Sequence, residues 1–189
     1  MIYFTSDWHL GHNRIIELSN EDFSSIEERD NLIISNCNEK VGKDDTLIMV
    51  GDILMEKDND RAEELLDKIN CENLILIKGN HESITLEYEE YFKDIRGDFY
   101  FEIRDPEVPG NIQGIHIYHY PVLSWNNMRP FYSAGVLEHF GSIHLHGHSH
   151  GSRVQNSKWD WYYEQRVWDL SVEVNDYEPK SYNEIKNIY

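Results

Sequence analysis

The sequence predicts an α/β fold, and three observations support this class. Short runs of apolar residues have the length and composition of buried strands, and they lie at 2–5, 46–50, 74–77 and 115–118. Segments with helical spacing separate the first three runs. Each run ends in a cluster of polar residues. Apolar strands that alternate with helices predict a sheet buried on both faces, with parallel pairs early in the chain.

Two helices are expected between the first three strands. Ser25-Ile26-Glu27-Glu28 is a candidate capping box that leads toward Leu32 and Ile33. The second helix is predicted from apolar residues at helical spacing, namely Ala62, Leu65, Leu66 and Ile69. The expected order of elements is therefore β-α-β-α-β.

From residue 99 onward the pattern changes. Strand candidates at 99–104, 115–118, 143–145 and 167–174 are separated by turns rich in Pro, Gly and Asn. This arrangement predicts hairpins or a second sheet. The sequence contains no internal repeat, low-complexity tract or interdomain linker, so we expect a single domain over residues 1–189.

The composition limits the classes of partner. The formal net charge is −18 at pH 7, and no run of Lys or Arg forms a basic stripe. Stable binding to duplex nucleic acid is therefore not expected, because the acidic surface repels phosphates. An anionic substrate is not excluded, since bound divalent cations can reverse the field inside a cleft.

The sequence also bears on the compartment. No segment approaches the length of a membrane span, and the N-terminal residues lack the features of a signal peptide. Cys37 and Cys71 are far apart, which indicates neither a disulfide framework nor a Cys-rich zinc site. We therefore expect a cytoplasmic protein that does not associate with membranes. The oligomeric state is not predicted.

Polar motifs follow five of the expected strands. Open α/β sheets place ligand sites beyond the carboxyl ends of their strands, so these motifs are expected to meet at one edge. Asp-x-His and Gly-Asp are weak motifs alone, Gly-Asn-His is more specific, and His-x-His after a Gly is a metal signature by itself. Their joint occurrence at strand ends indicates a metal site. The motifs are Asp7-Trp8-His9, Gly51-Asp52, Gly79-Asn80-His81, His119-Tyr120-Pro121 and Gly147-His148-Ser149-His150.

In this order the motifs resemble those of the calcineurin-like metallophosphoesterases, and the resemblance spans nearly the whole chain. The segments at 7–13, 145–151 and 172–179 further resemble the small bacterial and phage members of that family. The resemblance implies a four-layer α/β/β/α sandwich of two mixed sheets. It also implies a dimetal site at the edge where the strands end.

The resemblance implies a role for each motif residue. Asp7, His9, Asp52 and His150 would hold the first metal ion. The second would be held by Asp52, Asn80, His119 and His148, so that Asp52 bridges the two. Mixed oxygen and nitrogen ligands suit Mn²⁺, Fe²⁺ or Zn²⁺ better than Mg²⁺, and manganese is the first expectation.

The expected activity is hydrolysis of phosphodiesters of a small molecule or nucleotide, with monoesters as a second class. A water shared between two ions loses a proton near neutral pH and attacks phosphorus in line. The catalytic residues would be Asp52, which bridges the two ions, and His81. His81 is placed to donate a hydrogen bond or proton to the leaving oxygen or to a nonbridging oxygen.

Two alternatives to this activity stay open. One is a phosphomonoesterase or phosphoprotein phosphatase. The protein phosphatases of the family have the pattern Gly-Asp-x-x-Asp-Arg-Gly, whereas Gly51-Asp52 is followed here by Ile-Leu-Met-Glu at 53–56. This difference argues against a phosphoprotein phosphatase. The other is a non-catalytic scaffold of the same fold, which is expected to lose ligands, whereas all ligand positions here are filled.

Further residues have both a functional and a structural interpretation. His12 could face the cleft and touch the substrate phosphate, or it could be a capping or surface histidine. Arg129 could clamp a phosphate with its fork of donors, or it could be a surface arginine. An aromatic set could stack a nucleobase or form an oligomer face, but packing of the second sheet is favoured; it comprises Trp125, Trp159, Trp161, Tyr162, Tyr163 and Trp168.

The remaining histidines are assigned mainly structural roles. His116 and His144 lie within expected strands, so packing is favoured for both. His146 precedes Gly147 closely enough to orient a metal-bound histidine, and packing is the equal alternative.

Overall fold

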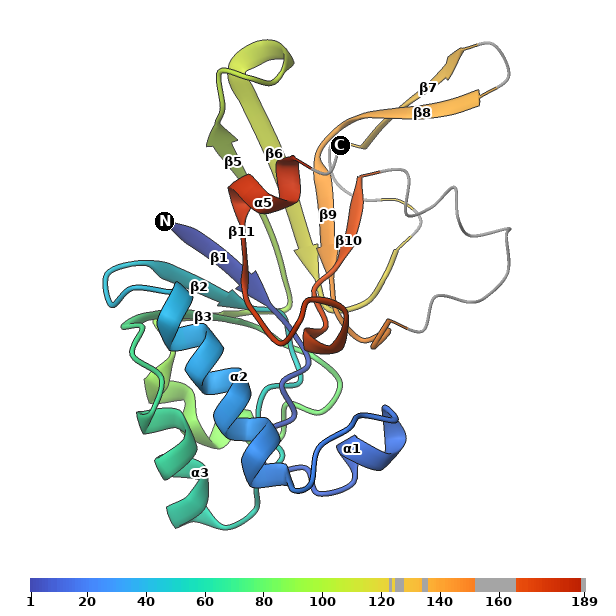
Figure 1. Cartoon of the computed structure of the whole chain (residues 1–189). Coiled ribbons are helices and arrows are strands. Elements are labelled where there is room, and N and C mark those ends of the chain that lie inside the picture. Colours follow the sequence, from blue (N-terminus) through green and yellow to red (C-terminus); the bar gives the residue numbers. More distant parts are fainter. Residues whose placement is uncertain (123, 125–127, 134–135, 152–165, 188–189) are drawn as a thin grey trace.

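The computed structural model of the chain describes residues 1–122, 124, 128–133, 136–151 and 166–187. Its fold is mixed α/β, with two mixed sheets and helices, which confirms the predicted class (Figure 1). The assignment of the whole chain to a single domain stays a prediction.

The first sheet has five strands in the order β11-β1-β2-β3-β4. Four of them run parallel to one another: β1 (Ile2–Thr5), β2 (Thr46–Met49), β3 (Asn73–Ile77) and β4 (Asp94–Arg96). The fifth strand, β11 (Lys180–Ser181), is antiparallel to β1. The predicted early parallel pairs are therefore confirmed. Parallel pairing brings the carboxyl ends of β1, β2 and β3 to one edge of the sheet.

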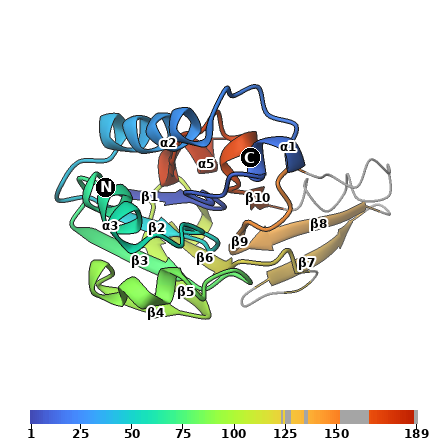
Figure 2. The ribbon, with the colours of Figure 1, turned by 90° about the horizontal axis from the view of Figure 1, so that it is seen from below.

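The second sheet has four strands in the order β10-β9-β6-β5. The strands β6 (Ile112–Tyr118), β9 (Ile143–His146) and β10 (Val167–Asp169) are parallel, and β5 (Asp98–Arg104) is antiparallel to β6. A separate hairpin of β7 (Met128–Ser133) and β8 (Val136–Gly141) extends away from both sheets (Figures 1 and 2).

The helices α2 (Ile26–Lys40) and α3 (Asn59–Asp67) follow β1 and β2, as predicted. Ser25 caps α2 by accepting a hydrogen bond from the Glu28 N–H at 3.2 Å. The Glu28 carboxylate, however, accepts from the N–H of Ser24 at 2.9 Å, so the predicted capping box is only half formed. Short helical segments complete the fold: α1 (Ile15–Leu18), α5 (Tyr182–Lys186), η1 (Thr85–Tyr91), η2 (Pro109–Asn111) and η3 (Val172–Val174).

One predicted strand is too long. The expected strand at 167–174 ends at Asp169, and Val172–Val174 forms the 3-10 turn η3. Side chains take over the backbone hydrogen bonds of this segment, which offers the chain an alternative to a ladder. The Asp169 carboxylate accepts from the Ser171 N–H at 3.0 Å, and Asn175 Nδ2 donates to the carbonyl oxygens of Asp169 and Ser171, both at 2.9 Å.

The core consists of two clusters on opposite faces of the first sheet. Leu47 and Met49 of β2 pack with side chains of α2 and α3 on one face. Ile48, between them, points to the other face and packs with Ile117 and Leu145 of the second sheet. The alternation buries both faces of the first sheet, as expected, and each such aliphatic side chain stabilises the fold by roughly 1.5–3 kcal/mol.

Cys37 and Cys71 are both buried and both free. Within the described part of the chain, none of the helices combines the length and apolar character needed to cross a bilayer.

Candidate metal centre

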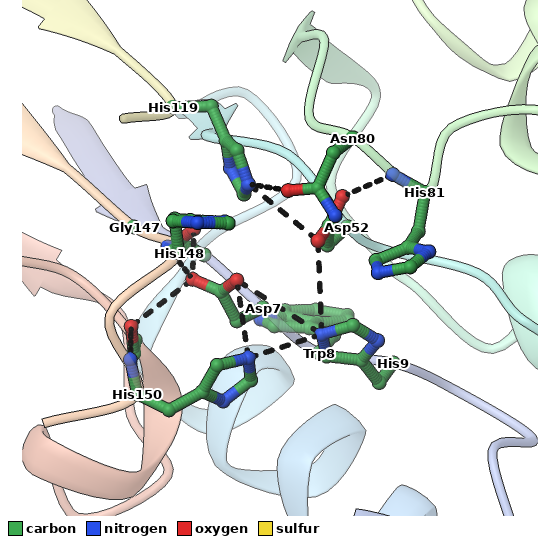
Figure 3. A network of polar contacts seen from close by, with 12 residues as sticks. Asp7, Trp8, His9, Asp52, Asn80, His81, His119, Gly147, His148 and His150 are labelled. Atoms are coloured by element: carbon green, nitrogen blue, oxygen red, sulfur yellow. Dashed lines mark hydrogen bonds and ion pairs between the residues drawn. The ribbon is translucent and has the colours of Figure 1, made fainter. Parts of the chain in front are cut away.

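The polar motifs that follow five strands come together at one place (Figure 3). Two groups of side chains each place their ligand atoms within 4.8 Å of one another. The first group contains Asp7, His9 and His150, and the second contains Asp52, His119 and His148. We call them the first and the second cluster. Both contain one carboxylate and two imidazoles, a donor set that suits a divalent transition metal.

The backbone at these residues is unusual. A non-glycine residue with positive φ is uncommon and costs of order 1–3 kcal/mol when strained, although Asp and His tolerate it better than most. Such outliers concentrate at functional sites. Five of the predicted ligands have positive φ, namely Asp7 (57°), His9 (48°), Asp52 (58°), His148 (67°) and His150 (46°).

Backbone hydrogen bonds between the loops hold this conformation. The N–H of Asp7 donates to the carbonyl oxygen of Gly51 at 3.0 Å, and the N–H of His9 donates to that of Asp52 at 3.0 Å. The loops after β1 and β2 therefore fix one another, and the two carboxylates are positioned together.

Asp7 has one satisfied and one unsatisfied oxygen. Its Oδ2 accepts from the N–H of His148 at 2.9 Å and lies 2.6 Å from Ser6 Oγ and 3.0 Å from Ser171 Oγ. Its Oδ1 is buried and has no hydrogen-bond partner, but it lies 3.6 Å from His150 Nε2. Burial raises the pKa of Asp7 to about 6. A buried carboxylate oxygen without a donor fits a metal ligand.

The two histidines of the first cluster face each other. His9 Nε2 and His150 Nε2 lie 3.3 Å apart. Burial, followed by the neighbouring His150, lowers the pKa of His9 to about 3, so that His9 is neutral and able to act as a ligand. Burial also opposes protonation of His150, but the Glu173 and Asp7 carboxylates outweigh it and raise its pKa to about 9. The same negative charges favour a cation at this position.

Asp52 lies between the clusters. Its Oδ2 is 3.5 Å from His119 Nε2 and 3.9 Å from His9 Nε2. Its Oδ1 accepts from the backbone N–H of His81 at 2.8 Å. Burial raises the pKa of Asp52, but the hydrogen bond and charge of His119 outweigh it, and the pKa is lowered overall. The geometry leaves Oδ2 available to both clusters.

Asn80 contacts the second cluster through its side-chain oxygen. Asn80 Oδ1 lies 3.0 Å from His119 Nε2. His119 Nδ1 donates to the carbonyl oxygen of Val50 at 2.8 Å, which leaves Nε2 as the nitrogen that faces the cluster. The ring of His148 lies against that of His119, with centroids 5.2 Å apart.

Two motif glycines are required because other groups approach them closely. A Cβ at Gly79 would overlap Oδ1 of Asp52, and a Cβ at Gly147 would overlap Ser6 Oγ and Oδ2 of Asp7. The glycines in the Gly-Asn-His and Gly-His-x-His motifs therefore make room for the two carboxylates.

Several supporting residues were not assigned from the sequence. Glu82 is buried, and its Oε1 accepts from the N–H groups of Asp52 at 2.7 Å and Ile53 at 3.3 Å. Asp169 accepts from the N–H of Gly151 at 3.2 Å and bonds the Ser149 hydroxyl, which orders the loop that carries His148 and His150. Glu82 follows a motif directly, but Asp169 is far from any motif in the sequence, so no pattern distinguishes the pair from other acidic residues.

Two predicted residues lie beside the first cluster. The ring centroid of His81 is 5.9 Å from that of His9, and the His81 side chain is exposed. The ring centroid of His12 is 5.7 Å from that of His9, and the N–H of His12 donates to the carbonyl oxygen of His9 at 3.0 Å. His12 lies three residues before the start of α1.

Most of the remaining candidates lie outside the described residues. Arg129 lies in β7, but its side chain is outside the described residues, as are Trp125, Trp159, Trp161, Tyr162 and Tyr163. Trp168 in β10 packs against the core between the sheets and donates to Asn175 Oδ1 at 3.1 Å.

Three further histidines lie in the second sheet. His116 and His144 are paired across β6 and β9, with their Nδ1 atoms 3.1 Å apart. His146 Nδ1 donates to the carbonyl oxygen of Gly147 at 2.8 Å, within the loop that leads to His148. His146 therefore contacts the backbone beside a predicted ligand.

Comparisons with known proteins give relatives without a stated activity. No family model matches the chain. An uncharacterised protein of Methanocaldococcus jannaschii is 35% identical over 96 residues, which cover 48% of this chain and 54% of that protein, so the chain spans about half of that relative. The gene 66 protein of Mycobacterium phage L5 is 26% identical over 171 residues, which cover 80% of this chain and 78% of that protein.

A solved structure also resembles the chain over its full length. It is a protein of unknown function from Aquifex aeolicus, with a TM-score of 0.70 and 26% identity, and the match covers 100% of this chain and 99% of the other. The similarity supports the mixed α/β architecture.

Proposed function

We propose that the chain is a two-metal phosphoesterase of the calcineurin-like metallophosphoesterase family that hydrolyses phosphodiesters, and also monoesters, of a small molecule or nucleotide. One observation carries the proposal: Asp52 Oδ2 lies within 4 Å of histidine nitrogens from both clusters, at 3.5 Å from His119 and 3.9 Å from His9. A carboxylate in that position can bridge two ions.

The proposal assigns ligand atoms from the described contacts. Asp7 Oδ1, His9 Nε2, His150 Nε2 and Asp52 would hold the first ion, and Asp52, Asn80 Oδ1, His119 Nε2 and His148 the second. The buried Oδ1 of Asp7, which accepts no hydrogen bond, supports this assignment, because an unsatisfied buried carboxylate oxygen is costly without a cation. Manganese is the first choice, with iron or zinc as alternatives.

When bound, two divalent cations would neutralise the charge of a phosphate ester and lower the pKa of a water molecule between them. The protein supplies orientation. The Val50 carbonyl fixes His119 with Nε2 toward the cluster, and the His81 N–H fixes one oxygen of Asp52, so that the other is free. These contacts hold the ligands before any ion binds, which lowers the cost of binding.

His81 is proposed as the residue that donates a hydrogen bond or proton to the leaving oxygen. Its backbone is held at Asp52, while its side chain is exposed beside His9. It can therefore contact a substrate without being a ligand. His12, on the other side of His9, is proposed to contact the phosphate group.

The proposed family also implies a four-layer sandwich. The core shared by the two sheets, together with α2 and α3 on the outer face of the first, supports the α/β/β part of this arrangement. The outer helical layer on the second sheet stays a prediction.

The test compares hydrolysis of bis-p-nitrophenyl phosphate and p-nitrophenyl phosphate, with Mn²⁺ and after chelation. Preferential, metal-dependent cleavage of the diester is expected, and a preference for the monoester would favour a phosphomonoesterase. Asp52→Asn should abolish both activities, whereas Asp105→Asn, at another buried carboxylate that contacts Tyr182 and Lys186, should retain them. Unchanged turnover in Asp52→Asn would refute the proposal.

A further inference from the structure

A buried charge lies behind the first cluster. Arg29 of α2 is fully buried, with a side-chain exposure of 0%. Its Nε donates to Glu21 Oε2 at 2.6 Å, its Nη2 lies 3.4 Å from Glu173 Oε1, and its Nη1 donates to the carbonyl oxygen of Trp8. A buried ion pair often contributes little net stability, because desolvation offsets the attraction. Stability alone is therefore a weak reason for this arrangement.

One contact of Arg29 reaches the loop after β1. Trp8 lies between the ligands Asp7 and His9, and both ligands have positive φ. The Trp8 ring is buried and its Nε1 donates to Thr5 Oγ1 at 2.7 Å, so that side chain and carbonyl are both anchored. The bond from Arg29 to the Trp8 carbonyl thus restrains the peptide that joins two ligands in a strained conformation.

The second contact reaches His150. Glu173 Oε1, which faces Arg29, also lies 2.9 Å from His150 Nδ1. At this distance Nδ1 donates, and Nε2 is left to face Asp7 Oδ1 at 3.6 Å. Metal-binding histidines usually donate their other ring hydrogen to a carboxylate or carbonyl oxygen, which fixes the ring and its tautomer. Glu173 occupies that place for His150.

The second cluster is supported by different residues. His119 is held by the Val50 carbonyl, and Asp52 by the His81 N–H and by Glu82 at its own backbone. None of the described contacts of Arg29 or Glu173 involves Asn80, His119 or His148. The support is therefore asymmetric between the two clusters.

We propose that Arg29 and Glu173 are positioning residues that hold the Asp7–His9–His150 cluster, and not the second cluster, in the geometry of a metal site. The inference rests on the proposed function, because it takes both clusters to bind ions. It predicts that a substitution that leaves every ligand intact can weaken the binding of one ion and not of the other.

The test uses Mn²⁺ titration of the full chain, read by metal content and by electron paramagnetic resonance. In the unsubstituted protein we expect two ions per chain and the spectrum of a coupled pair. Glu173→Ala should weaken one site about 10- to 100-fold, the usual effect of removing such a partner. One ion should then remain, with the resolved hyperfine pattern of an isolated Mn²⁺.

Two further variants sharpen the test. Glu173→Gln should recover most of the affinity, because its amide oxygen can still accept from His150 Nδ1. Arg29→Lys should resemble Glu173→Ala, since one ammonium group cannot reach both the Trp8 carbonyl and Glu173; if it does not fold, the Glu173 pair decides. Asp105→Ala is the matched control. Asp105 is a buried carboxylate that accepts hydrogen bonds from Tyr182 and Lys186 and contacts none of the predicted ligands in the described contacts.

The outcomes separate the two proposals. Two ions bound with unchanged affinity in Glu173→Ala would overturn the positioning role, and so would equal weakening of both sites or a similar loss in Asp105→Ala. An unsubstituted chain that binds no ion pair would overturn the proposed function itself, and the positioning role with it.

Discussion

The backbone N–H of His81 donates to Oδ1 of Asp52 at 2.8 Å. This bond joins the loops that follow β2 and β3, and it uses the main chain of His81, not its imidazole. The side chain of His81 can therefore be removed without removing the contact that orients Asp52.

His81→Ala should lower kcat by roughly 10²- to 10⁴-fold, the usual contribution of a general acid, with little change in metal content. The loss should be larger for esters with poor leaving groups, because those need the proton most. Rates measured over a series of aryl phosphodiesters, with metal analysis on the same samples, check this. Parallel loss of ions would instead make His81 a ligand-supporting residue.

Gly147→Ala should destabilise the protein by about 1–3 kcal/mol, as expected when a methyl group is forced into a packed site. The added Cβ would overlap Ser6 Oγ and Oδ2 of Asp7, so Mn²⁺ affinity should also fall. Gly97→Ala is the matched control, because a Cβ there meets nothing within 4 Å, and its effect should stay within about 0.5 kcal/mol. Urea denaturation and Mn²⁺ titration of both variants measure these effects. Equal stability and equal Mn²⁺ affinity of the two variants would contradict the close contact of Gly147 with Ser6 and Asp7.

Asp30→Asn should change how stability depends on pH. Asp30 is buried on α2, its Oδ2 accepts from the Gly11 N–H at 3.0 Å, and burial raises its pKa from 3.8 to about 6. The folded state therefore binds this proton more tightly than the unfolded state, and ionisation of Asp30 costs stability as pH rises from about 4 to 6. The uncharged amide introduced by Asp30→Asn avoids that cost.

The stabilisation by Asp30→Asn should rise from near zero at pH 4 to at most about 3 kcal/mol above pH 6, since one pKa unit corresponds to about 1.4 kcal/mol. Asp105→Asn should instead destabilise the protein at neutral pH, and this loss of stability should shrink in acid. The hydrogen bond from Tyr182, followed by those from Glu107 and Lys186, lowers the pKa of Asp105, so its contribution is present at neutral pH and is lost in acid. Denaturation curves at several pH values decide; a pH-independent Asp30→Asn effect would count against the raised pKa.

Mn²⁺ should stabilise the folded chain, and chelation should reverse the effect. An ion that binds only the folded state at 100 times its Kd adds about 2.7 kcal/mol per site. Asp52→Asn should lose most of this gain, because Oδ2 of Asp52 faces both clusters. Thermal unfolding with and without Mn²⁺ measures it, and an equal shift of Tm in Asp52→Asn would exclude Asp52 as a ligand.

The sequence by itself determined three of the five strands of the first sheet, the two long helices and the residue types of the candidate centre. These depend on local signals. Apolar runs predicted β1, β2 and β3 within one residue of their observed ends, and the parallel order brings the motifs after them to one edge. The rule that ligands collect at the carboxyl edge then suffices to group residues that are far apart in the chain.

Only the tertiary structure decided how these residues are held. The left-handed backbone at Asp7 and His150 depends on contacts with other loops. The strand predicted at 167–174 stops at Asp169, because side chains of Asp169 and Asn175 satisfy the backbone beyond it. Arg29 and Glu173 are 144 residues apart, and their contact leaves no periodic trace in either segment. Helical spacing around Arg29 predicts a helix, but it does not predict that the charged side chain turns inward to contact the Trp8 carbonyl and Glu173.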